Sequence, residues 1–140
     1  MAIQDLGPNP YVVDIEKLTL ENENFRTAAW TGTYFQMTLM TIVVGGQVGL
    51  EVHEDTDQFL RLEQGKAKVV MGPSADNLDK EWSAEDDWAI FVPAGTWHNI
   101  INDGDEPLKL YSIYAPVHHP HGTVQATYED AQAAEAAEAH

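Results

Sequence analysis

Two histidines, a glutamate and a glutamine are spaced so that three β-strands would bring their polar atoms to one point. Glu51 and His53 are separated by one residue, and side chains two apart on a strand project from the same face. Gln58 follows a short polar turn, at the start of the returning strand, and His98 lies on a third predicted strand. Two imidazoles, one carboxylate and one amide oxygen form a donor set for a divalent metal ion.

This donor set contains no sulfur, because the chain has no cysteine. Mn²⁺ or Fe²⁺ suits such oxygen and nitrogen ligands, and Zn²⁺ or Ni²⁺ is a further candidate because general affinity orders favour them. Two histidines with one carboxylate are also the ligands of non-haem iron oxygenases. A metal-free pocket is the alternative, since a single histidine is more often a surface residue or a hydrogen-bonded core residue.

A second group of polar residues follows the last predicted strand. Three of the four residues from 118 to 121 are histidines, separated by one proline. This loop either folds over the mouth of the site and supplies a proton donor or contacts a second subunit. Tyr114 and His119 are therefore the candidate catalytic acid–base residues beside the metal.

Short β-strands at intervals of roughly ten residues account for most of the chain and indicate an all-β sandwich or barrel. The residues between them are rich in Gly, Pro and Asp. The predicted strands cover residues 34–44, 48–53, 58–63, 67–71, 88–92, 97–101 and 108–115.

Three segments follow from this pattern: an N-terminal arm over 1–32, a barrel over 33–116, and a tail over 117–140. The arm has room for one short helix within 14–25. The tail holds the histidine loop and an acidic, alanine-rich stretch over 129–139. Alanine favours helix, but without an apolar stripe such a helix is expected to be a frayed, solvated tail.

Two segments of the chain resemble the paired motifs of the cupin family. The first motif is G-x5-H-x-H-x3,4-E-x6-G, and its positions are occupied here by Gly45, Glu51, His53, Gln58 and Gly65. The second is G-x5-P-x-G-x2-H-x3-N, and its positions are occupied by Asp87, Pro93, Gly95, His98 and Asn102. The second motif departs from the family pattern only at Asp87, whereas Glu51 replaces a histidine and Gln58 a glutamate in the first.

The resemblance implies a double-stranded β-helix, the jelly-roll barrel of cupins, around a divalent metal held by three histidines and one glutamate. The residues at the matching positions here are Glu51, His53, Gln58 and His98. It also implies dioxygenase, isomerase, epimerase or decarboxylase chemistry on a small oxygen-rich molecule, in which the metal acts as a Lewis acid. A non-catalytic, small-ligand-binding module is the competing function.

Many small cupins also resemble mannose-6-phosphate isomerases, whose phosphosugar substrate calls for basic side chains. No basic residue is predicted to reach the site here. Arg61 is predicted to face outward, Lys66, Lys68 and Lys80 lie beyond that strand in a hairpin and a loop, and Lys109 alternates with two leucines. A neutral or chelating substrate, such as a keto acid or diketone, is therefore favoured over a sugar phosphate.

The net charge of −16 excludes nucleic acids and anionic membrane surfaces as main partners. Such an acidic surface is also typical of proteins from salt-loaded cytoplasms. The N-terminus shows no secretory signal, so a cytoplasmic location is expected. Apolar residues on both faces of the predicted strand 34–44 favour a homodimer, although the arm over 1–32 is another way to cover one face.

Overall fold

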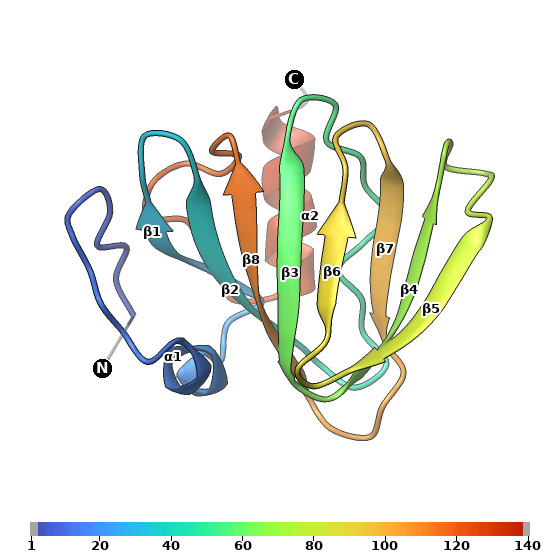
Figure 1. Ribbon diagram of the computed structural model, residues 1–140, viewed down its shortest axis with the longest axis horizontal. Coiled ribbons are helices and arrows are strands. Elements are labelled where there is room, and N and C mark those ends of the chain that lie inside the picture. The colour runs from blue at the N-terminus through green and yellow to red at the C-terminus, as the bar shows by residue number, and fades with distance from the viewer. Residues whose placement is uncertain (1–2, 139–140) are drawn as a thin grey trace.

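Two β-sheets form the protein, and residues 3–138 are described by the computed structural model (Figure 1). The six-stranded sheet has the order β6-β3-β8-β2-β1-β9 and the three-stranded sheet the order β5-β4-β7. In chain order the elements are α1 (Ile15–Glu21), β1 (Arg26–Thr31), β2 (Gln36–Ile42), β3 (Asp57–Gln64), β4 (Lys66–Gly72), β5 (Lys80–Glu85), β6 (Ala89–Val92), β7 (Trp97–Asn102), β8 (Leu108–Ala115), β9 (Val124–Gln125) and α2 (Tyr128–Glu138). The predicted all-β double-stranded β-helix is confirmed.

One end of the six-stranded sheet carries the apolar core on its inner face. Directly paired residues of antiparallel strands point to the same side, and Met40 pairs with Leu110, which pairs with Leu62. All three side chains are fully buried. The three-stranded sheet closes this core from the other side with Val69 and Ile100.

The other end of the same inner face is polar. Gln36 pairs with Tyr114, which pairs with Gln58, and one step further along the strands Thr38 pairs with Ser112. All five side chains are buried. We call these five residues the polar end of the sheet. A fold that needed only an apolar core would not bury such a row, because buried polar groups cost free energy unless they are paired.

Residues 48–53 do not form the regular strand that the sequence predicted. Gln47 and Glu51 instead make isolated bridges to Ile101 and His98 of β7. Gly49 lies between the two bridges with a φ of +111°, a conformation that glycine adopts without a steric penalty and that interrupts the strand. The segment still runs along β7, so its side chains remain at the site.

Three strands were missed by the sequence analysis: β1 within the predicted arm, β5 after the loop at residue 74, and the two-residue β9 within the predicted tail. The helix predicted within 14–25 is α1, whose first turn is capped by Asp14. The outer face of β2 is covered by the protein's own arm, because Ile3, Ile15 and Leu18 pack against the cluster of Met37 and Leu39.

This contact accounts for part of the apolar surface that favoured a homodimer. Tyr34, Phe35 and Val43, at the two ends of β2, stay exposed. The homodimer therefore stays a prediction.

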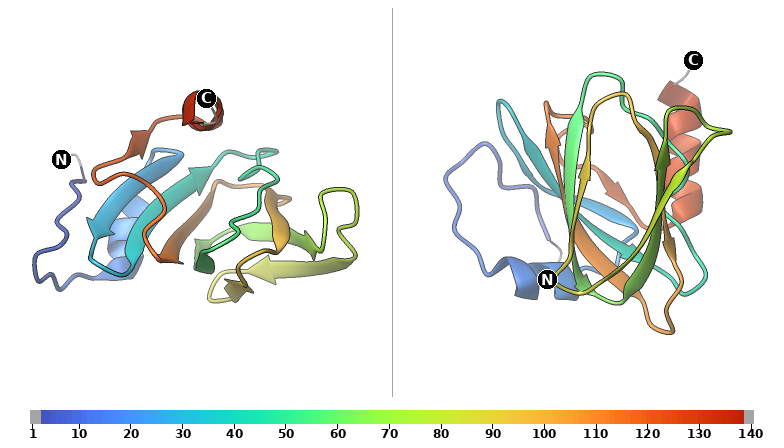
Figure 2. Two further views of the ribbon diagram at one scale, coloured as in Figure 1. Left: turned by 90° about the horizontal axis from the view of Figure 1, so that it is seen from above. Right: turned by 45° about the vertical axis from the view of Figure 1, so that its right-hand side comes forward.

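The expectation of a frayed C-terminal tail is wrong, because α2 docks on the barrel. Its Tyr128 ring meets the Phe25 ring edge-on at 5.7 Å between centroids, and Ala131 is buried. Figure 2 shows α2 lying along the outside of the barrel. Tertiary contacts thus supply the stability that an alanine-rich helix without a strong apolar stripe lacks on its own.

No helix among residues 3–138 is long and apolar enough to cross a membrane.

Candidate metal centre

Glu51, His53 and His98 converge as the sequence predicted. The Oε1 atom of Glu51 lies 3.3 Å from Nε2 of His53 and 3.5 Å from Nε2 of His98. One ligand atom from each residue fits within 4.8 Å of the others. Both imidazoles are buried and Glu51 is nearly so, so the three groups face one another away from bulk water.

The backbone pairing of two segments sets this geometry. Glu51 N–H donates to the His98 carbonyl at 3.0 Å, and His98 N–H donates to the Glu51 carbonyl at 2.9 Å. The turn before β7 also holds His53, because Gly95 N–H donates to its carbonyl at 2.7 Å. Gly95 has a φ of +83°, a conformation that most side chains disfavour, which accounts for glycine in the second motif.

The hydrogen bonding of His98 fixes its tautomer. Its Nδ1 lies 3.0 Å from the Thr96 carbonyl oxygen, and a carbonyl only accepts, so Nδ1 carries the hydrogen. In the neutral ring, Nε2 then presents a lone pair toward the Glu51 carboxylate. Two electron-rich atoms at this separation require a proton or a metal cation between them. A backbone partner on the second ring nitrogen is also the usual arrangement of metal-binding histidines.

Gln58 contributes one more buried acceptor. Its Nε2 donates to the Ser112 hydroxyl at 2.8 Å, which leaves Oε1 buried without a hydrogen-bond partner. Three other atoms share that state: Glu51 Oε1, His53 Nε2 and His98 Nε2. Buried polar atoms are normally paired, and a divalent cation would satisfy such acceptors together. The donor set therefore fits a metal ion.

The electrostatics of the centre keep Glu51 ionised. Burial by itself would raise the pKa of this carboxyl, but the neighbouring imidazoles of His53 and His98 outweigh burial and lower it. A carboxylate held ionised among imidazoles is suited to a cation.

The histidine loop after β8 folds back onto this centre. The His118 ring lies 4.2 Å from the His53 ring, between centroids, and stacks on Tyr114 at 5.5 Å. His119 meets Tyr114 edge-on at 5.1 Å. The sequence left two roles open for this loop, one at the mouth of the site and one at a second subunit. The position of the loop agrees with the first role, because His118 and His119 lie at the site.

Two residues hold the loop in place. Gln36 accepts from His119 N–H at 2.9 Å and donates to the His119 carbonyl at 2.8 Å. Asp5 accepts from Gly122 N–H at 2.9 Å and lies 3.4 Å from Nε2 of His121. His121 therefore lies against the N-terminal arm, outside the group of Glu51, His53 and His98.

The two candidate acid–base residues are both held neutral by their surroundings. Tyr114 is fully buried, and burial raises the pKa of its phenol, so the hydroxyl remains a hydrogen donor. Burial, together with the charges of Arg26 and His118, lowers the pKa of His119 to about 3. At neutral pH the His119 ring is therefore an acceptor and not an acid. Its Nε2 is buried without a hydrogen-bond partner.

This shift of the His119 pKa predicts an acid-sensitive fold in metal-free protein. The pKa of His119 is lowered from 6.5 to about 3 in the folded protein, so below pH 6.5 the unfolded chain binds a proton that the folded protein excludes. The free energy of unfolding is therefore highest above pH 6.5 and falls as pH falls toward 3. Between pH 7 and pH 5, the free energy of unfolding of the wild type should fall by about 2 kcal/mol more than that of His119→Gln. Urea unfolding in a chelating buffer measures both; equal pH dependence would contradict the prediction.

Arg26 is the residue near the site that the sequence analysis missed. The expectation that no basic side chain reaches the site considered five others, because residue 26 was placed in the arm. The structure puts Arg26 on β1, paired with Met40 of the core face, with only 1% of its surface exposed. The run from Phe25 to Trp30, rich in apolar and aromatic residues, was the available indication of a strand.

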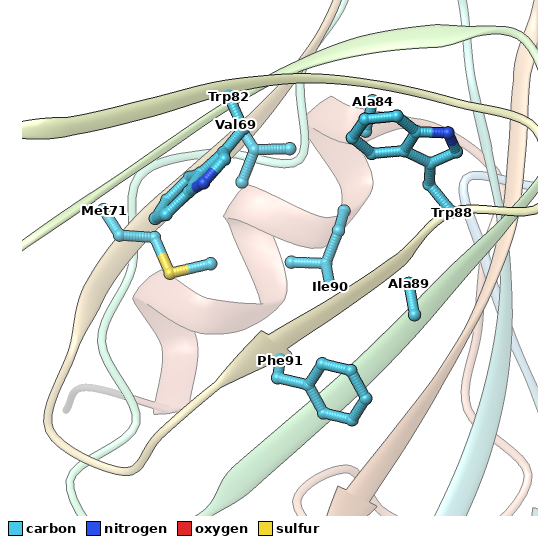
Figure 3. A pocket seen from close by; sticks show the side chains of 8 residues that line it. All are labelled: Val69, Met71, Trp82, Ala84, Trp88, Ala89, Ile90 and Phe91. Atoms are coloured by element: carbon cyan, nitrogen blue, oxygen red, sulfur yellow. The ribbon is translucent and has the colours of Figure 1, made fainter.

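A separate pocket of about 260 Å³ lies between β6 and the three-stranded sheet. Figure 3 shows Val69, Met71, Trp82 and Ile90 pointing into the same space. The residues that line it carry no acid, base or metal ligand. Trp82 and Trp88 line this pocket and are about half exposed.

Known proteins match the chain in sequence and in structure. The model of the cupin domain matches residues 38–114. Protein YrkC of Bacillus subtilis is 56% identical over 135 residues, which cover 96% of this chain and 73% of YrkC. Protein L612 of Acanthamoeba polyphaga mimivirus is 37% identical over 81% of this chain and 70% of its own.

The crystal structure of BH2720 from Bacillus halodurans superposes with a TM-score of 0.93 at 55% identity. The match covers 94% of this chain and 99% of that chain. The similarity therefore extends beyond the barrel to most of the arm and the tail.

Proposed function

The chain belongs to the cupin family, and we propose that it binds one divalent metal ion through Glu51, His53 and His98, with Gln58 as a fourth, neutral ligand. The observation that supports this most directly is the set of four buried acceptor atoms, one from each residue, without hydrogen-bond partners. Mn²⁺ or Fe²⁺ is the favoured ion, and Zn²⁺ or Ni²⁺ is the next choice.

We propose further that the protein is an enzyme acting on a small oxygen-rich molecule, such as a keto acid, a diketone or a sugar-like compound. The bound ion would supply Lewis-acid polarisation of a substrate oxygen. Since only Glu51 among the four ligands carries a negative charge, one charge of a divalent ion is left uncompensated. A carbonyl or enediol-type oxygen would benefit from that charge.

Tyr114, at the polar end of the sheet, and His119, in the loop beside it, would act as the acid–base residues. Tyr114 keeps its proton, because burial raises its pKa, and is suited to donate a hydrogen bond to a substrate oxygen. Neutral His119 offers a buried lone pair to a substrate hydroxyl or to a proton in transit. Gln36 would position His119 through the two hydrogen bonds to its backbone.

The alternative is a metal-free module that binds a small ligand without turnover. Under that alternative the lone pair of His98 would face the carboxylate of Glu51 with nothing but a proton between them. A metal satisfies more of the unpartnered atoms than a proton does, so we favour the metal.

The metal content of protein produced without a histidine tag and without chelators tests the proposal. We expect about one transition-metal ion per chain by mass spectrometry, removed by dialysis against a chelator and restored by Mn²⁺ or Fe²⁺. Anomalous scattering at the metal edges should place the ion between Glu51, His53 and His98. Protein that neither carries metal nor takes it up would support the metal-free module.

A further inference from the structure

We propose that Arg26 forms an anion subsite inside the barrel that binds a carboxylate group of the substrate. This inference deepens the proposed function by naming a substrate class. It rests on that function only for the metal beside the subsite, because the subsite itself is built by Arg26 and its neighbours.

The register of β1 points the Arg26 side chain inward. Arg26 pairs with Met40, and Met40 pairs with Leu110. The side chains of all three therefore leave the backbone on the core face of the sheet. Two residues further along β1, Ala28 pairs with Thr38 of the polar end. Arg26 and the polar end of the sheet therefore share its inner face, with only Ala28 of β1 between them.

The guanidinium of Arg26 is only partly satisfied within the protein. Its Nη1 donates to the Gln125 side-chain oxygen at 2.7 Å, and its Cζ lies over the Phe25 ring, 5.3 Å from the ring centroid. Its Nε is buried without a hydrogen-bond partner. None of the carboxylates that the structure describes forms an ion pair with it. A buried charge without a counter-charge is costly, and a ligand anion would supply both the missing charge and the missing acceptor.

The strand register relates Arg26 to the metal centre. On the shared inner face, Thr38 pairs with Ala28 of β1, two residues from Arg26, and with Ser112 of β8, two residues from Tyr114. The Arg26 side chain therefore starts on the same face of the sheet as Tyr114, whose ring lies 5.9 Å from the His53 ring between centroids.

The chemistry favours a carboxylate over a phosphate. An Nε–H with a neighbouring Nη is the edge of a guanidinium that binds two carboxylate oxygens side by side. A doubly charged phosphate would need more than this one cation and would meet stronger repulsion from a chain of net charge −16. A divalent ion, Glu51 and Arg26 together leave two positive charges, which suits a substrate with one carboxylate and an oxygen on the metal.

The test compares pyruvate with pyruvamide, its uncharged amide, by calorimetric titration of three metal-loaded proteins: wild type, Arg26→Met and Arg61→Met. Met is unbranched and apolar, so it keeps most of the Arg stem without the guanidinium charge. Arg61 is the other arginine of the chain and pairs with Glu63 and Asp87 on the outer face, so its variant removes the same charge elsewhere.

We expect wild type and Arg61→Met to prefer pyruvate by roughly 10-fold or more, the size of a charge-assisted hydrogen bond. The preference should fall below about 3-fold in Arg26→Met. An unchanged preference in Arg26→Met would overturn the subsite. Inorganic phosphate that competes more tightly than pyruvate, and only when Arg26 is present, would overturn the carboxylate assignment.

Metal analysis of the same samples separates this proposal from the proposed function. If the wild type holds no metal, the proposed function fails. A titration of metal-free protein with acetate and with acetamide still tests whether Arg26 binds a carboxylate. In that titration the ¹⁵Nε resonance of Arg26 should shift with acetate and not with acetamide. The same measurement on wild type replaces the variant if Arg26→Met does not fold; a resonance insensitive to acetate would overturn the proposal.

Discussion

Replacing His98 by alanine is expected to abolish stoichiometric metal binding while leaving the barrel folded. His98 supplies a fixed lone pair, because its other nitrogen is held by the Thr96 carbonyl. Second-layer substitutions around metal ligands alone cost roughly 10–100-fold in affinity, so loss of a direct ligand should cost at least about 100-fold. Competition with a metal-chelating dye measures the affinity, and circular dichroism checks the fold.

His121→Ala is the matched control for that variant. His121 belongs to the histidine loop after β8, and its Nε2 lies 2.9 Å from the Gly7 carbonyl oxygen. Its side chain is largely exposed and outside the metal cluster. It should bind metal like the wild type. Full stoichiometry in His98→Ala would place the ion elsewhere, and His118 and His119 would become the leading candidates.

Glu51→Gln should produce the second large effect, because it removes the only negative charge among the four ligands without changing the shape of the side chain. Affinity in oxygen-ligand sites follows the number of charged ligands, and here the site is buried, where charge interactions are poorly screened. We expect affinity for Mn²⁺ or Fe²⁺ to fall by about 100-fold or more, measured by the same competition titration.

Two further variants show whether charge or shape is responsible. Glu54→Gln removes a charge three residues away, from an exposed side chain, and should leave affinity within about 2-fold, because charges in water interact weakly. Glu51→Asp keeps the charge and shortens the side chain, so it should bind better than Glu51→Gln. Equal affinity in wild type and Glu51→Gln would contradict the assignment of Glu51 as a ligand.

The candidate metal ligands Glu51, His53 and His98 were predictable from local patterns. Alternation along an extended chain places Glu51 and His53 on one face, and Gly95 marks the turn that leads into His98. These relations span a few residues each, so they survive even where the regular strand predicted over 48–53 is absent.

The residues around the metal were not predictable in the same way. The loop of His118 and His119 reaches the site because β8 ends beside it and Gln36, more than eighty residues earlier in the chain, holds the His119 backbone. No residue close to these histidines in the sequence indicates that contact. Their spacing alone left a site role open but favoured a surface or interface role.

The sequence by itself determined the all-β class, the cupin resemblance and three converging metal-ligand candidates, because period-two alternation and turn residues act over short distances. Only the tertiary structure decided that Arg26 lies inside. The choice depends on the register of β1 against β2, and a shift of one residue would send the same side chain to the outer face. Register is fixed by packing over the whole sheet, which no short segment of the chain contains.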